Sequence, residues 1–204
     1  MTEAFFPGEN KAWDTLSMLD PGVVSRDALV EYNAASHAYL VRSFGMTFEI
    51  TPASRSISSS DGGCDILLGG LGLYFRPSAL WYLISAKNIA ATSRFVKPAE
   101  IRGGDIFSRG AHVLPLDSVA EKFGKDRDAF VDTGLRRGGA KALLGGDASV
   151  LLYPFPRIPV LLSLWLQDDE FPARADIFFD STCIFHLPTD VLWSTAMLTV
   201  ALMS

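Results

Sequence analysis

The sequence predicts an α+β fold, formed by a single globular domain with a mostly antiparallel or mixed sheet and flanking helices. Short β-rich runs and helical segments follow one another in mixed order, without the strict alternation of a doubly wound sheet. The 204 residues are 49% hydrophobic and 20% charged, which is typical of a chain that buries a core. We therefore expect one domain over residues 1–204, with an N-terminal helix and small β-meander in 1–60 and a main body in 64–204.

The first third predicts one short helix and then an antiparallel meander. In residues 11–20 apolar side chains recur at helical spacing, and Pro21-Gly22 is expected to end that helix. The serine-rich stretch 54–63 ends in a glycine pair and is interpreted as an exposed loop or hairpin return. The expected strands, rich in β-branched and aromatic residues, are 29–32, 38–44 and 46–50.

The middle of the chain predicts helices with a turn-rich segment among them. Pro77 suits the first turn of a helix over 77–87, whose broad apolar stripe is typical of a core-facing helix. Residues 98–109 contain Gly103-Gly104 and are expected to form turns. The other expected elements are a helix over 65–73, a strand over 94–96, and helices capped by Asp117 and Asp126.

The last third has the clearest pattern. Three strands are expected, and the second is nearly all apolar, which favours a central position in the sheet. A closing helix follows, with Thr189 as its expected N-cap and only a narrow polar stripe. The strands are expected at 148–153, 159–166 and 175–179, with 167–174 as a connection.

Composition excludes several classes of function. The chain has 18 basic and 23 acidic residues and a net charge of -5, so it lacks the basic excess that nucleic-acid binding requires. Its two most apolar stretches are interrupted by arginine and proline, and neither predicts a membrane span. Cys64 and Cys183 match no zinc or iron–sulfur spacing and are expected to be buried free thiols. No signal peptide is visible, and we expect a cytoplasmic protein.

The acidic turn formed by Asp168, Asp169 and Glu170 is one candidate site. Clustered carboxylates, with Asp176 and Asp180 nearby, are the ligands that magnesium and calcium prefer. The spacing matches no EF-hand, however, and a solvated turn with Asp180 as a cap is the favoured interpretation. No metal site is therefore assigned.

Any ordinary general base must come from His37, His112 or His186, the three histidines of the chain. His112 is the best candidate because it follows a glycine-rich loop and lies beside Arg109, although a hydrogen-bonded structural histidine is favoured. The glycine-rich segment 134–146 carries basic residues that suit phosphate, but it fits no phosphate-binding motif and is interpreted as a turn-rich surface. No nucleophile elbow is present.

Three segments together resemble a known family. They are PRIPVLLSLWLQDDEFPARADIFFDSTCIFHLPTD near the C-terminus, WYLISA and RGGDIFSRGAHVLPL. They are similar to a family of uncharacterised prokaryotic proteins, frequent in anaerobes and catalogued as a domain of unknown function, over most of residues 64–193. Some relatives carry a cysteine-rich cluster-binding segment that this chain lacks, so an iron–sulfur role does not follow from the resemblance.

Three functional hypotheses follow. The first is a binding protein with an apolar pocket for a small molecule or cofactor. The anaerobic setting of the relatives implies a tetrapyrrole or corrinoid. The second is an enzyme in which Asp169 or Glu170 acts with His112, with a divalent ion, on a hydrolysable substrate. The third is a dimer or partner interface, for example in a homodimer. The expected ligand-binding residues are Arg102, Arg109, His112, Asp168, Asp169 and Glu170.

Overall fold

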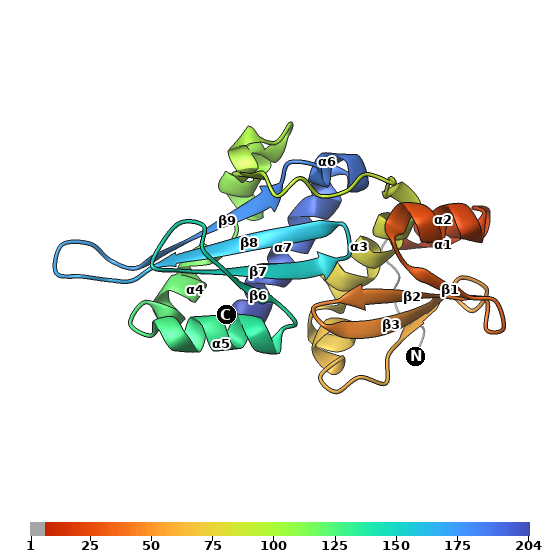
Figure 1. The fold of residues 1–204 in the computed structure, drawn as a ribbon. Coiled ribbons are helices and arrows are strands. Elements are labelled where there is room, and N and C mark those ends of the chain that lie inside the picture. Colours follow the sequence, from red (N-terminus) through yellow and green to blue (C-terminus); the bar gives the residue numbers. More distant parts are fainter. Residues whose placement is uncertain (1–6) are drawn as a thin grey trace.

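The computed structural model describes residues 7–204, apart from the side chains of residues 7, 108 and 111. Among these residues it contains two sheets in which the paired strands are antiparallel, so the α+β prediction is confirmed (Figure 1). The smaller sheet has the order β1-β2-β3-β4 and the larger has the order β5-β9-β8-β7-β6. The strands are β1 (Glu31–Asn33), β2 (Ala38–Ser43), β3 (Met46–Thr51), β4 (Ser56–Ser58), β5 (Phe95–Val96), β6 (Ala140–Ala142), β7 (Ala148–Phe155), β8 (Ile158–Trp165) and β9 (Arg174–Asp180).

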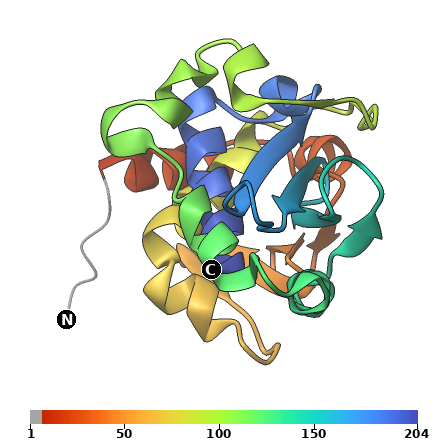
Figure 2. The ribbon, with the colours of Figure 1, turned by 90° about the vertical axis from the view of Figure 1, so that its left-hand side faces the viewer.

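Helices cover the larger sheet and join it to the smaller one. The C-terminal helix α7 packs against both α3 and β7, and its place in the interior is visible in Figure 2. Within residues 7–204, no helix is long and apolar enough to span a bilayer. The helices are α1 (Pro7–Ser17), α2 (Pro21–Ala28), α3 (Gly72–Ser85), α4 (Leu116–Phe123), α5 (Arg127–Arg136), α6 (Cys183–His186) and α7 (Thr189–Met203), with a π-helical turn η1 (Ile66–Gly70) and 3-10 turns η2 (Pro98–Glu100), η3 (Gly104–Ser108) and η4 (Gly110–His112).

The three strands of the last third lie within two residues of their expected bounds. β8 pairs with β7 on one side and β9 on the other, and every residue of β8 except Trp165 is buried. Its uninterrupted apolar run therefore does correspond to a central strand. The expected capping role of Asp126 is also confirmed, because its Oδ1 accepts a hydrogen bond of 2.9 Å from the main-chain N–H of Ala129.

The N-terminal helices differ from the prediction. α1 ends at Ser17, and Pro21 begins α2 instead of ending the first helix. Proline is suited to the first position of a helix because its missing N–H would have no intrahelical partner there. Asp20 caps α2, since its Oδ1 accepts a hydrogen bond of 2.9 Å from the N–H of Val23. Part of the predicted 54–63 loop is β4, which pairs with β3.

The expected helix start at Pro77 is also wrong. A single helix, α3, contains this proline in its interior, and η1 precedes the helix. Pro77 removes one intrahelical hydrogen bond. Buried side chains on both sides of it, including Phe75, Ala79 and Leu80, anchor the helix in the core. The expected cap of α7 is wrong as well: Thr189 is the first residue of the helix, Pro188 occupies the cap position, and the Thr189 hydroxyl donates to the main-chain oxygen of Arg102.

The two sheets share one hydrophobic cluster and meet at a close backbone contact. The N–H of Phe44, in the turn between β2 and β3, donates a hydrogen bond of 2.9 Å to the main-chain oxygen of Tyr153 in β7. Beside it, Gly45 and Gly138 both have positive φ, and a Cβ on Gly138 would lie 2.4 Å from the Cα of Gly45. The small sheet is therefore held against β7 of the larger one.

The two cysteines occupy different environments. Cys183 is buried, as expected, and burial raises the pKa of its thiol to about 12. Cys64 is only partly buried, so the expectation of two buried thiols holds for one of them. Both are free.

Candidate functional site

A cleft of about 840 Å³ lies where the two sheets meet. We call it the inter-sheet cleft. One wall comes from the end of α2 and the outer face of the small sheet, and the other comes from the β7–β8 hairpin. Its size is in the range of small-molecule sites. Its lining residues are Ser25, Arg26, Leu29, Val30, Glu31, Leu40, Arg42, Ser43, Gly45, Thr47, Asn88, Gly138, Tyr153, Pro156 and Arg157.

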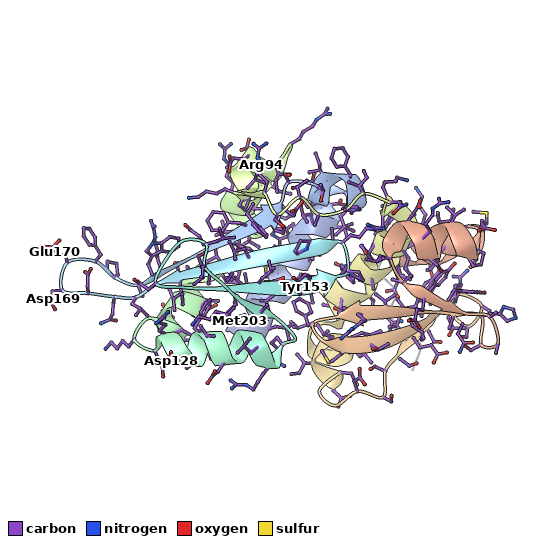
Figure 3. All side chains as sticks on the ribbon, viewed as in Figure 1. Arg94, Asp128, Tyr153, Asp169, Glu170 and Met203 are labelled. Carbon is purple, nitrogen blue, oxygen red and sulfur yellow. The ribbon has the colours of Figure 1, made fainter. Side chains whose placement is uncertain are left out.

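The alternation of β-strand side chains explains why this wall faces a cleft. In β2, Tyr39 and Val41 are buried in the core, whereas Leu40 is partly exposed and Arg42 is exposed on the other face. Arg42 pairs across the sheet with Thr47 of β3, which also lines the cleft. Tyr153 of β7 contributes a half-exposed aromatic ring at the junction of the two sheets (Figure 3).

Arg157 forms the floor of the cleft and is buried. Its guanidinium donates hydrogen bonds to the main-chain oxygens of Asp27 (2.7 Å), Arg26 (3.1 Å) and Ile89 (3.0 Å), and to the side-chain oxygen of Asn88 (2.8 Å). The oxygens of residues 26 and 27 belong to the last turn of α2, where carbonyls lack intrahelical donors. Arg157 therefore caps α2 and connects it to the loop after α3.

Tyr82 of α3 supports the same turn from beneath. Its hydroxyl donates to the main-chain oxygen of Ala28 at 2.6 Å and accepts a hydrogen bond of 3.1 Å from the N–H of Arg157. Its ring stacks on Phe155, with the centroids 4.7 Å apart. Burial raises the pKa of this phenol well above its usual value, so Tyr82 is neutral and acts as a fixed hydrogen-bonding group.

The loop between α3 and β5 is held by two further buried polar residues. The carboxylate of Asp180 accepts hydrogen bonds from the N–H groups of Thr92 (2.9 Å) and Ser93 (2.6 Å), and Nδ1 of His186 accepts one from Lys87 (3.3 Å). Burial alone would raise the pKa of Asp180, but its hydrogen bonds, led by those from Thr182, lower it. An ionised carboxylate thus holds the loop.

His186 is buried and neutral. Burial and, to a smaller extent, the nearby Arg157 charge lower the pKa of its imidazole to about 4, and Asp180 opposes both. Because Nδ1 accepts from Lys87, the proton of the neutral ring lies on Nε2, which has no hydrogen-bond partner among the described residues. This histidine is a poor general base at neutral pH.

The polar groups of the cleft are unevenly satisfied. Arg26 forms an ion pair of 2.8 Å with Asp27, whereas no ion pair in the described part of the chain involves Arg42 or Arg157. Ser25 and Ser43 belong to the lining, but their hydroxyl oxygens are buried and have no hydrogen-bond partner in residues 7–204.

The acidic turn lies elsewhere. Asp169 and Glu170 are at the tip of the β8–β9 hairpin, which projects from the end of the molecule opposite the small sheet (Figure 3). Asp168 accepts hydrogen bonds from the N–H groups of Glu170 (2.9 Å) and Phe171 (2.7 Å), which closes the turn. All three acidic residues are exposed, and the described residues contain no group of three metal-ligating side chains.

The other predicted site residues gather near the start of α7. The ring of His112 packs edge-on against Trp193, and its main-chain oxygen accepts a hydrogen bond of 2.7 Å from Trp193 Nε1. Its own N–H donates to the main-chain oxygen of Arg109. Arg102 contributes its main-chain oxygen to Thr189. No hydrogen bond or ion pair in the described residues joins His112 to the acidic turn, so their joint action remains a prediction.

Two smaller cavities lie outside the inter-sheet cleft. One of about 390 Å³ borders the 98–117 region and contains the ion pair between Lys97 and Asp176, but its described lining includes none of the six predicted site residues. The other, of about 190 Å³, lies at the glycine-rich loop and is lined by Arg127 and Lys141. The glycine-rich segment 134–146, which was considered for phosphate binding, contributes residues to this second cavity.

Sequence reasoning missed the cleft and its arginines. Arg157 was visible as the one charged residue within the apolar stretch 150–166, where it served only to argue against a membrane span. A charged side chain inside such a stretch must find polar partners when the strands are buried. That signal could have identified Arg157 as a buried hydrogen-bonding residue, but not Arg42, whose neighbours are distant in sequence.

Comparison with protein families gives one match. The family model described as "Domain of unknown function (DUF3786)" covers residues 20–202 of the chain. No curated protein and no solved structure matches the chain.

Proposed function

Because the chain belongs to the DUF3786 family, whose description names no activity, we propose from the geometry that it binds a small molecule in the inter-sheet cleft. The observation that carries the proposal is a concave space of about 840 Å³ with apolar walls and a few polar groups. Binding sites for small molecules have this character. The binding residues are then those of the cleft, in place of the 102–112 loop and the acidic turn.

Within this class, a tetrapyrrole or corrinoid is the proposed ligand. Leu29, Leu40 and Tyr153 supply an apolar and aromatic surface on which a broad ring could pack. The cleft is bounded by rigid elements, because Arg157 and Tyr82 tie α2 to the β7–β8 turn. Such pre-organisation lowers the entropic cost of binding.

Titration with protoporphyrin IX and with hydroxocobalamin tests the proposal. We expect a shifted absorbance band and a higher Tm. At a ligand concentration one hundred times Kd, the free energy of unfolding should rise by about 2.7 kcal/mol. If neither compound changes the spectrum or the Tm, the tetrapyrrole assignment is wrong.

A pair of tryptophan variants locates the binding. Leu40→Trp fills the cleft and should abolish binding, because the indole occupies the space of the ligand. Leu73→Trp is the matched control, since Leu73 is exposed on α3 and does not line the cleft. Equal binding by wild type and Leu40→Trp would place the ligand elsewhere.

A further inference from the structure

The end of β2 presents a cation to the cleft without an ion partner. Arg42 is exposed there and forms no hydrogen bond or ion pair with any residue of the described chain. It lies on the outer face of the small sheet with Leu40 and Thr47, which also line the cleft. The N–H donors of its guanidinium are therefore available to an oxygen-bearing ligand.

The lining of the cleft has more positive than negative groups. Arg26, Arg42 and Arg157 line it, and Glu31 is the only acidic residue among its described lining. Of the acidic residues just outside the lining, Asp27 pairs with Arg26, and Glu49 stands across the sheet from Leu40. The lining itself, with three positive groups and one negative group, has a positive excess, whereas the chain as a whole is negative.

Arg157 contributes its charge to this positive excess, but its guanidinium is already hydrogen-bonded within the protein and is not free to bind a ligand. Four hydrogen bonds from its guanidinium go to carbonyl and amide oxygens, and no carboxylate pairs with it in the described chain. The negative end of the α2 dipole offsets part of its charge. Arg157 is therefore a positioning residue that favours an anion above it, while Arg42 has all its donors available.

We propose that the ligand of the inter-sheet cleft carries an oxyanion group, a carboxylate or a phosphate, and that Arg42 binds it. This inference rests on the proposed function and deepens it by naming the ligand's chemical class. Arg42 pairs with the oxyanion through its guanidinium. The apolar part of the ligand lies against Leu40 and Tyr153.

Three naphthalene probes of similar shape test this assignment by calorimetry or NMR titration on the full chain. 1-Naphthoate carries a carboxylate, 1-naphthyl phosphate carries a phosphate, and 1-naphthylmethanol is neutral. We expect at least one anionic probe to bind at least tenfold more tightly than the alcohol, and the tighter of the two identifies the oxyanion. Raising sodium chloride from 50 to 500 mM should weaken only the anions.

Variants assign the effect to Arg42. Arg42→Gln should weaken the preferred anion about tenfold and leave the alcohol unchanged, and Arg42→Lys should restore part of the loss. Arg94→Gln is the matched control, because Arg94 is an exposed arginine that points away from the cleft (Figure 3). Thermal unfolding of each variant establishes that it is folded.

Two outcomes overturn the inference in distinguishable ways. If all three probes bind alike and Arg42→Gln changes nothing, the oxyanion assignment is wrong while the small-molecule cleft stands. If no probe binds and the tetrapyrrole titrations also fail, the proposed function is wrong together with this inference.

Discussion

Nε of Arg157 donates a hydrogen bond of 2.7 Å to the main-chain oxygen of Asp27, a residue 130 positions earlier in the chain. This contact joins the β7–β8 turn to the last turn of α2 and forms the floor of the inter-sheet cleft. It replaces the partners that the helix-terminal carbonyl lacks. One side chain thus provides both the cap of a helix and part of a site.

Replacing Arg157 tests how strongly this network stabilises the fold. Arg157→Lys keeps the charge but cannot reproduce four directed hydrogen bonds. We expect a loss of about 2–4 kcal/mol in the free energy of unfolding, because buried carbonyls are left unpaired. Urea denaturation measures the loss. Arg94→Lys, on the surface, should change it by less than about 0.5 kcal/mol. A similar small effect at Arg157 would contradict the network's role.

His186 makes stability depend on pH. Its pKa is about 4 in the folded protein, against 6.5 for an unperturbed imidazole. Between pH 6.5 and 4 the imidazole is therefore protonated in the unfolded chain but not in the folded chain. The free energy of unfolding falls as the pH decreases through this range. The loss reaches up to about 3 kcal/mol, since one pKa unit corresponds to about 1.4 kcal/mol.

The measurement compares urea denaturation of wild type and His186→Asn between pH 4 and 8. Asparagine can keep an acceptor near the N–H of Lys87 but does not titrate. We expect the variant to have a shallower dependence below pH 6.5, whereas His37→Gln, at an exposed position, should keep the wild-type dependence. Parallel curves for wild type and His186→Asn would show that His186 is not the responsible group.

Ser43→Ala should stabilise the fold. Removing a buried, unpaired hydroxyl raises the free energy of unfolding by about 1 kcal/mol. Ser163→Ala is the control, because the Ser163 hydroxyl donates to the main-chain oxygen of Leu144 at 3.0 Å, and its loss destabilises. Thermal unfolding of the two variants distinguishes the effects; destabilisation by Ser43→Ala would contradict the prediction.

The contact between Gly45 and Gly138 should tolerate no side chain. Gly138 has a φ of +68°, and a Cβ there would lie 2.4 Å from the Cα of Gly45. We expect Gly138→Ala to lower the free energy of unfolding by more than about 2 kcal/mol, because backbone must move on both sheets. Gly69→Ala meets no atom within 4 Å and serves as the control. Thermal unfolding of the two variants, followed by circular dichroism, measures the difference. Equal Tm values for the two variants would contradict the prediction that this contact between the sheets requires glycine.

Strands and helix starts were predicted correctly where the residues that specify them lie close together in the sequence. The apolar run of β8 specified a central strand because it is buried between two neighbours, and Asp126 specified a helix start because its side chain bonds to its own helix. Proline was misread twice. Pro21 begins a helix because its missing N–H would have no intrahelical partner at that position. Pro77 lies inside a helix because neighbouring side chains are anchored in the core, where tertiary packing outweighs local propensity.

The sequence by itself determined the α+β class, the antiparallel strands of the last third and the absence of familiar metal or nucleophile motifs, since these depend on residues close together in the chain. Only the tertiary structure decided where the cleft lies. Arg42, Tyr153 and Arg157 come from separate elements, and their meeting depends on the contact of the two sheets at Gly45 and Gly138. Periodicity reports which face of a strand is buried, but not which distant segment faces it.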